Sequence, residues 1–100
     1  MRELQSVEIE WHPRAQNDTF EIADYINIDS PTSALAISDE IQRQVSMLID
    51  HPRLGRLGRI PGTRELVIAH TSYIAIYRII GERIRILRIF HGARKWPRRL

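Results

Sequence analysis

The sequence predicts an α+β protein in which a helical hairpin packs on one face of an antiparallel sheet, in the order β-α-α-β-β-β. The main observations are two neighbouring stretches with helical periodicity, followed by three stretches rich in β-branched residues with no helix between them. An alternating stretch near the N-terminus supplies the remaining strand. One hundred residues, 43% of them hydrophobic, suit a single domain over residues 1–100 with one core.

The N-terminal half is expected to hold one strand and both helices. Residues 7–11 alternate apolar and acidic side chains, the period of a half-buried strand. Pro13 stands in the first turn of one helix, and Ser30 with Pro31 opens a second helix that ends at Pro52. Because their link is very short, we expect an antiparallel hairpin that covers one sheet face and leaves the other available. The expected apolar stripes are Ala15, Thr19, Ile22, Ala23 and Ile26 in the first helix, and Leu35, Ser38, Ile41, Val45 and Leu48 in the second.

Three strands are expected in the C-terminal half, after a loop at residues 53–63. That loop holds three glycines, a proline and three arginines, and it lacks the Gly-x-x-x-x-Gly-Lys-[Ser/Thr] spacing of a nucleotide-binding P-loop. Residues 64–69, 73–80 and 83–90 follow as strands, with a tight hairpin turn at Gly81. They should form an antiparallel meander, with the first strand of the chain beside the last one or next to it.

The two halves of the chain carry opposite charge. Through Pro52 there are three basic and ten acidic residues, and from Arg53 onward there are twelve basic and two acidic ones. The halves are therefore formally −7 and +10, which together give the net charge of +3. This asymmetry predicts that the basic half faces phosphate or an acidic protein. The alternative is a solvated surface on which the charges happen to segregate.

Composition excludes several classes of function. Without cysteine the chain has no disulfide, no thiol nucleophile and no thiolate metal site. The other three histidines show no metal-ligand spacing with His91, so we expect neither a metal nor another cofactor. The apolar runs are too short to cross a bilayer and the N-terminus has no apolar signal segment, so a cytoplasmic protein with no membrane partner is expected.

The last predicted strand runs directly into a polar cluster at His91. A histidine near neutral pKa can act as a general acid or base, and Arg94, three positions on, can stabilise a developing phosphate charge. The alternative is a histidine that caps the strand and bonds a backbone carbonyl. Arg88, within the same strand, would be costly to bury unpaired, so a bulge or an edge position is expected there.

Basic and aromatic side chains could together bind a nucleic acid on the sheet face and its rim. Tyr73, Tyr77 and Trp96 offer rings for base stacking, although both tyrosines could equally be core residues and Trp96 a C-terminal anchor. The basic positions are Arg56, Arg59, Arg64, Arg78, Arg85, Arg94, Lys95, Arg98 and Arg99. The helix carboxylates Asp18, Glu21, Asp24, Asp39 and Glu40 are most simply a solvated face.

Motifs along nearly the whole chain resemble one family. They are "W-x-P-R-A" opening the first helix, "I-A-D-Y-I" within it, "P-x-x-A" opening the second, "H-P-x-L-G-R", "P-G-T-R-E-L", "Y-I-x-x-Y-R" and "I-L-R-I-F-H-G-A-R-K-W-P". In this order and at this spacing the chain resembles bacterial toxins of the RelE/ParE superfamily, the toxin halves of type II toxin–antitoxin modules. The resemblance implies the strand–helix–helix–three-strand fold already expected.

The resemblance implies one of two targets. ParE-like members poison DNA gyrase without catalysis of their own, whereas RelE-like members cut messenger RNA on the ribosome without a metal. We prefer gyrase because Ile74 replaces an arginine frequent in RNA-cleaving relatives and because the chain has a single lysine. If the chain is RelE-like, and so an enzyme, His91 and Arg94 are its catalytic residues. The residues expected to contact the target or nucleic acid are Arg59, Arg64, Arg78, Arg85, Lys95, Trp96 and Arg98.

The resemblance also implies a cognate antitoxin and a hetero-oligomer of the two proteins. An amphipathic antitoxin segment could fill the grooves and the open sheet edge, and acidic residues in it would suit the basic half. A third interpretation is a small basic RNA- or DNA-binding module that has lost toxicity.

Overall fold

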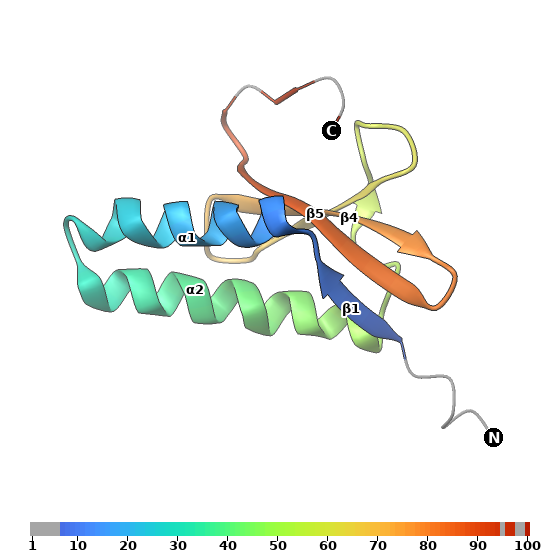
Figure 1. Ribbon diagram of the computed structural model, residues 1–100, viewed down its shortest axis with the longest axis horizontal. Helices are drawn as coiled ribbons and strands as arrows, with labels where there is room; N and C mark the ends of the chain where they lie inside the picture. Colours follow the sequence, from blue (N-terminus) through green and yellow to red (C-terminus); the bar gives the residue numbers. More distant parts are fainter. Residues whose placement is uncertain (1–6, 95, 98–99) are drawn as a thin grey trace.

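A computed structural model describes residues 7–94, 96–97 and 100. The chain forms β1 (Glu8–Trp11), α1 (Pro13–Asn27), α2 (Pro31–Ser46), a 3₁₀ turn η1 (Met47–Ile49), β2 (Arg56–Leu57), β3 (Arg64–Val67), β4 (Tyr73–Ile80) and β5 (Arg83–His91). The two helices lie side by side and project beyond the sheet, which lies across their other end (Figure 1). The predicted α+β fold is therefore confirmed.

The sheet differs from the prediction in two details. Its strand order is β1-β5-β4-β3-β2, and the short β2 lies within the segment expected to be only a loop. The first strand does lie beside the last one, but β1 pairs with β5 in parallel, so the sheet is mixed and not wholly antiparallel. The connection from β1 to β5 runs through both helices and through β2, β3 and β4. A connection of this length can bring the chain back in the same direction, whereas a hairpin joins only antiparallel strands.

Each helix begins where the sequence predicts, with a side chain capping a free backbone N–H. The Nδ1 atom of His12 accepts a hydrogen bond from the Arg14 N–H at 3.0 Å, and Pro13 follows in the first turn. The Ser30 hydroxyl oxygen accepts from the Ser33 N–H at 3.2 Å. No helix among the described residues is long and apolar enough to cross a membrane.

The main core lies between the helices and one face of the sheet. Ala15 of α1 and Ile41, Val45 and Leu48 of the α2–η1 segment are buried there, as predicted. Leu35 is 69% exposed, so the predicted start of the second stripe is wrong and the buried stripe begins at Ala34. The sheet contributes Leu66, Ile68, Ala75, Tyr77, Ile84, Ile86 and Ile89.

A β-bulge in β5 decides which of its side chains reach this core. Across the β4–β5 ladder Tyr77 is opposite Ile86, whereas the preceding residue Ile76 is opposite Arg88, which leaves Leu87 as the extra residue. The extra residue reverses the alternation, so Ile89 is buried in the core and Arg88 is not. Of the two alternatives expected for Arg88, a bulge or an edge position, the structure has the bulge.

The face of the sheet without helices has a smaller apolar cluster of its own. Ile74 and Ile76 alternate with core residues along β4 and so point away from the helices, yet they are 7% and 0% exposed. The segment between β2 and β3, which carries the buried Ile60, and the chain after β5 cover this face. The expectation that this face would be left available is wrong over that part.

Candidate functional site

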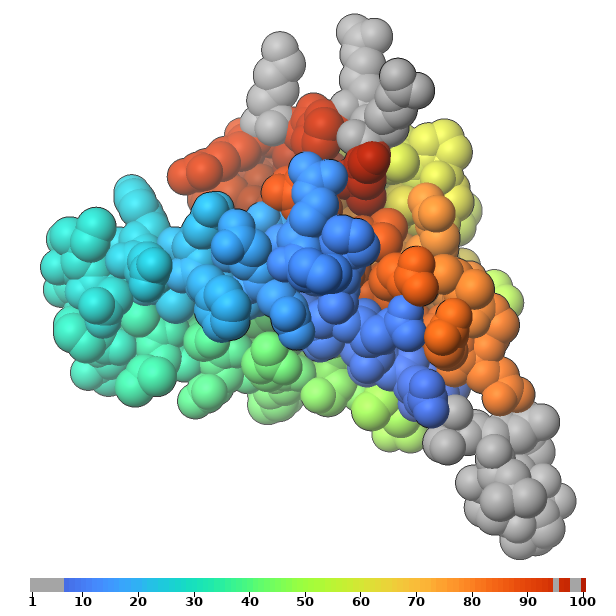
Figure 2. All heavy atoms as spheres, viewed as in Figure 1, coloured from blue at the N-terminus to red at the C-terminus, as the bar shows by residue number. Residues whose placement is uncertain are grey.

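A pocket of about 340 Å³ lies between α1 and the end of β5, and it contains both residues predicted to carry chemistry. His91 and Arg94 lie on its rim together with Trp96. In Figure 2 the C-terminal residues, drawn in red, border the blue and cyan residues of α1. The remaining lining residues are Asp18, Glu21, Ile22 and Tyr25 of α1, and Tyr73, Arg88, Ile89 and Phe90 of the sheet.

The His91 side chain is fixed by the turn that follows it. Its Nδ1 atom accepts a hydrogen bond from the Ala93 N–H at 3.1 Å, and its ring packs edge-on against Tyr73 at a centroid distance of 5.5 Å. An Nδ1 that accepts a hydrogen bond leaves the proton of neutral imidazole on Nε2. The ring nitrogen that is free to meet a ligand is therefore a donor and not a base in this conformation.

The His91 carbonyl oxygen organises the same turn. It accepts hydrogen bonds from the Arg94 N–H and from the Trp96 indole N–H, both at 3.1 Å. The Gly92 N–H also donates to the Ser72 carbonyl at 2.7 Å, which ties the turn to the start of β4. Trp96 is thus anchored against the sheet end, which was one of its two predicted roles.

An ion pair between α1 and β5 forms the floor of the pocket. The Arg88 guanidinium donates to both Asp18 carboxylate oxygens, at 2.8 and 3.0 Å, and the Ile89 N–H donates to one of them at 2.9 Å. β1 ends at Trp11, opposite Ile86, so beyond that point Asp18 takes the place of a strand along β5. The hydrogen bonds that Arg88 donates to Asp18 raise the pKa of Arg88 above its usual value, and the charge of Arg88 is satisfied within the chain.

The prediction that Asp18 belongs to a solvated helix face is therefore wrong, because it is 6% exposed. Its position offered a signal: Asp18 lies three residues after Ala15 and four before Ile22, within the predicted apolar stripe. A carboxylate on that stripe requires a cationic partner from the sheet.

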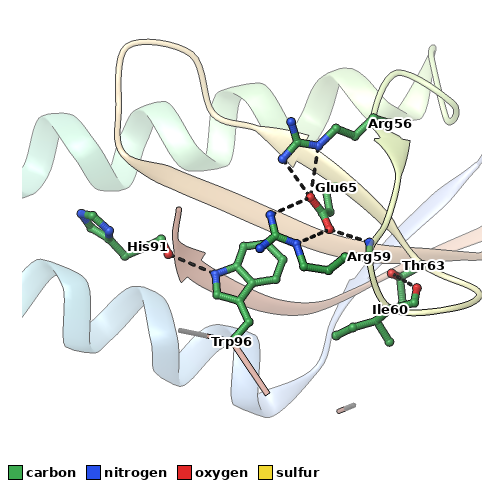
Figure 3. A network of polar contacts seen from close by, with 7 residues as sticks. All are labelled: Arg56, Arg59, Ile60, Thr63, Glu65, His91 and Trp96. Carbon is green, nitrogen blue, oxygen red and sulfur yellow. Dashed lines mark hydrogen bonds and ion pairs between the residues drawn. The ribbon is translucent and has the colours of Figure 1, made fainter. Parts of the chain in front are cut away.

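A second buried carboxylate, Glu65 of β3, forms ion pairs with Arg56 of β2 and with Arg59 of the loop that follows β2 (Figure 3). Arg56 donates to it at 2.9 and 3.1 Å, and Arg59 donates through its backbone N–H at 2.8 Å and its Nε at 3.1 Å. Burial alone would raise the pKa of Glu65, but the hydrogen bonds from Arg59 and Arg56 outweigh it and hold that pKa below its usual 4.5.

Arg59 also covers Trp96, which is drawn beside it in Figure 3. The guanidinium carbon lies 3.5 Å from the centre of the indole ring, and the indole packs on Phe90 at a centroid distance of 5.3 Å. A residue predicted to bind the target is thus occupied by contacts within its own chain.

The other predicted contact residues lie in different places. Arg64 lies on the helix side of β3 and donates to the Gly55 carbonyl at 2.7 Å, away from the pocket. Arg78 and Arg85 are cross-strand neighbours on the face without helices. Arg85 donates to Glu10 at 2.7 Å and thereby lowers the pKa of Glu10. Lys95 and Arg98 lie outside the described residues.

Of the rings considered for stacking, Tyr77 is a core residue, which was one of its two predicted roles. It is fully buried, its hydroxyl donates to the Pro52 carbonyl at 2.7 Å, and the Gly55 N–H donates to that hydroxyl at 2.9 Å. Tyr73, by contrast, lines the pocket. Tyr25 lines it too and is 67% exposed, which could not be predicted from the sequence because Tyr25 lies on α1, far along the chain from the motif at the end of β5.

The described residues offer no group of three or more His, Cys, Asp or Glu side chains that could hold a metal ion. Toward a ligand the pocket presents aromatic rings, one imidazole N–H donor and the guanidinium group of Arg94. The Arg94 side chain makes no ion pair with a described carboxylate. This arrangement suits contact with an anionic or aromatic group of a partner.

The helical hairpin packed on a five-stranded sheet is a fold that is also found in solved toxin–antitoxin structures. A chain of the "Crystal structure of the intact E. coli RelBE toxin-antitoxin complex" superposes with a TM-score of 0.65 at 13% identity, over 89% of this chain and 100% of that one. A likeness at this identity concerns the fold alone.

Three further comparisons show the family. A chain of the "Chromosomal ParDE TA system from P. aeruginosa" is 30% identical with a TM-score of 0.79, over 87% of this chain and 97% of that one. A Sinorhizobium fredii protein with the name "Putative toxin Y4kP" is 40% identical over 89 residues, which are 89% of this chain and 92% of that protein. The family model "ParE toxin of type II toxin-antitoxin system, parDE" matches residues 9–96. The chain belongs to the ParE toxin family.

Proposed function

We propose that this ParE-family protein inhibits growth by poisoning DNA gyrase, and that it does so by binding and not by catalysis. The observation that carries the proposal is the hydrogen bond from the Ala93 N–H to His91 Nδ1. It occupies Nδ1, the unprotonated ring nitrogen, so none is free to take a proton from a ribose hydroxyl. Ile74 supports the same conclusion, because it is buried and offers no cation where RNA-cleaving relatives often have arginine.

The contact surface in this proposal is the rim of the pocket at Arg94, together with Arg78 on the face of the sheet without helices. Arg94 and Arg78 are exposed, and neither makes an ion pair with a described carboxylate. Both can therefore meet acidic groups of gyrase or phosphates of its DNA without first breaking an internal pair. Because gyrase is inside the cell, the proposal also places the protein in the cytoplasm.

A supercoiling assay with purified protein tests the proposal directly. We expect inhibition of supercoiling and a trapped cleavage complex, and we expect Arg94→Ala to weaken the inhibition about tenfold, the loss that one exposed charge-assisted contact of about 1.4 kcal/mol would cause. Arg53→Ala is the matched control, since Arg53 is an exposed arginine that does not line the pocket. Wild-type protein that leaves gyrase fully active would remove this target.

The second candidate is ribosome-dependent cleavage of messenger RNA, favoured by the presence of His91 and Arg94 in one pocket with the rings of Tyr73 and Trp96. In that mechanism His91 acts as the general acid in its imidazolium form, giving the Nε2 proton to the leaving 5′-oxygen, which requires the hydrogen bond from the Ala93 N–H to Nδ1 to break, and another group must supply the base. Expression of His91→Ala in cells distinguishes the two candidates. Loss of both toxicity and codon-specific cuts would favour the nuclease, whereas full toxicity favours gyrase.

A cognate antitoxin and a hetero-oligomer with it are part of the proposal, since the similar solved structures come from toxin–antitoxin systems. The chain offers such a partner a sheet edge, because β2 pairs only with Arg64 and Glu65 and leaves Val67 of β3 open on that side. Exposed apolar side chains surround this edge: Met47, Leu54, Leu57 and Val67. Growth of cells that express the toxin with and without its neighbouring gene tests the pairing, and harmless expression in both cases would favour an inactive binding module.

A further inference from the structure

The chain after β5 is held on the sheet by a connected series of contacts that starts far away in sequence. Glu65 binds Arg59, Arg59 covers the Trp96 indole, and the indole N–H binds the carbonyl oxygen of His91. Figure 3 shows these side chains in one layer between the β2–β3 loop and the end of β5. We call residues 92–94 with 96–97 the C-terminal arm, and Glu65 with Arg59 the clasp.

Arg59 suits this role because a guanidinium can bond in two directions at once. Its edge carries N–H donors, and Nε and the backbone N–H meet the Glu65 carboxylate at 3.1 and 2.8 Å. Its flat face lies on the indole ring, with the guanidinium carbon 3.5 Å from the ring centre. The carboxylate thus fixes the plane of the guanidinium, and the plane fixes the indole.

Glu65 is placed where it can fix that plane but cannot touch a partner. Its side chain is 3% exposed, whereas those of Arg56 and Arg59 are 55% and 49% exposed. The loop that carries the arginines is itself braced, because the Thr63 hydroxyl donates to the Ile60 carbonyl at 2.6 Å and the Gly58 N–H to the Thr63 carbonyl at 2.8 Å.

We propose that Glu65 and Arg59 are positioning residues, which hold the C-terminal arm on the sheet through Trp96 and thereby set where Arg94 stands at the pocket rim. This gives Arg59 a role inside the chain in place of direct target contact. The part concerning Arg94 and the target depends on the proposed function, but the part concerning the arm does not.

The test measures how well the arm is held, through the accessibility of Trp96. The chain has two tryptophans, so Trp11→Phe provides a background in which Trp96 is the only indole. In that background we expect Arg59→Ala to raise the acrylamide quenching constant of Trp96 fluorescence about twofold, because the cation that covers the ring is gone. The quenching constant of Arg59→Lys should lie between those of the Trp11→Phe chain and its Arg59→Ala variant, since an ammonium group keeps the charge but lacks the planar face of a guanidinium.

The chain supplies a matched control in Arg56, which binds Glu65 as Arg59 does but does not cover Trp96. Arg56→Ala should change the quenching constant by no more than about a fifth, even if both alanine variants lower the melting temperature equally. Equal quenching in Arg56→Ala and Arg59→Ala, or no change in either, would overturn the proposal.

Glu65→Gln distinguishes positioning from direct contact with the target, because it keeps residue 59 as arginine and changes only a buried side chain. We expect the quenching constant and the loss of gyrase inhibition both to be close to those of Arg59→Ala. If quenching rises and inhibition does not change, the clasp stands and the arm is not the gyrase-binding element. If Glu65→Gln does not fold, added salt offers the same test on the Trp11→Phe chain with Glu65 intact. Quenching of Trp96 should rise between about 0.05 and 1 M NaCl as screening weakens the Arg59–Glu65 pair, and constant quenching would contradict the clasp.

Discussion

The two faces of the sheet are held by different forces, and the comparison explains why one is easier to predict than the other. The face under the helices is closed by apolar side chains that recur at helical and strand spacing. The opposite face is closed by a loop and the C-terminal arm, through a small apolar cluster, the ion pairs of Glu65 with Arg56 and Arg59, and the stacking of Arg59 on Trp96, which is distant from it in sequence. Apolar burial follows local periodicity, whereas an ion pair depends on where the fold brings two single residues.

The largest loss of stability is expected from a substitution on the helix-covered face. Comparing it with the same substitution on the opposite face measures how differently the two faces are packed. Ile86 and Ile76 are both fully buried, on opposite sides of the sheet. We expect Ile86→Ala to lower the free energy of unfolding by about 4 kcal/mol and Ile76→Ala by about 2 kcal/mol, because the thin cover of loop and arm can collapse into the space left behind. Urea unfolding of the two variants checks this. Equal losses would mean that the two faces are packed alike.

A smaller loss is expected at the border between the faces, where Asp18 binds Arg88. Asp18→Ala should cost about 3 kcal/mol, since it leaves a mostly buried guanidinium and the Ile89 N–H without their acceptor. The double variant Asp18→Ala with Arg88→Met should recover much of that loss, because no unpaired charge remains. A double variant no more stable than Asp18→Ala alone would show that the cost lies elsewhere.

The smallest effect concerns pH and belongs to the face without helices. The pKa of Glu65 is below 4.5 in the folded chain, so its contribution to stability is complete above about pH 4.5 and is lost as the pH falls through the lowered folded pKa. The groups that face it, Arg56 and Arg59, stay charged throughout. Acid unfolding of Glu65→Gln should therefore show a shallower fall in stability below pH 4.5 than the wild type. Parallel curves would mean that Glu65 is no better stabilised than in the unfolded chain.

Prediction from sequence succeeded for elements that repeat an apolar residue at a fixed spacing. Both helices begin where predicted, with Pro13 in the first turn of one and Ser30 capping the other, and the three C-terminal strands are present, although α2 ends at Ser46 and not at Pro52. Prediction from sequence left the outcome open, or was wrong, where a single residue decided it. One extra residue, Leu87, reverses the faces of β5, and one acidic residue on an apolar stripe, Asp18, turns out to be a strand-edge partner and not a solvated charge.

The candidate site was predicted in part for the same reason. His91, Arg94 and Trp96 are close in sequence, so their shared pocket rim could be anticipated from one motif. Tyr25, on a distant helix, could not be assigned to it. The direction of the His91 hydrogen bond, which bears most strongly on mechanism, depends on the conformation of the turn at Ala93 and not on residue types.

By itself the sequence determined the α+β class, the helical hairpin, the basic C-terminal half and the resemblance to a toxin family. These follow from periodicity, net charge and local motifs, which are properties of neighbouring residues. Only the tertiary structure decided the parallel β1–β5 pair, the bulge, and which arginines are neutralised within the chain. Those outcomes depend on distances between residues as far apart as Glu10 and Arg85, and such distances exist only once the chain has folded.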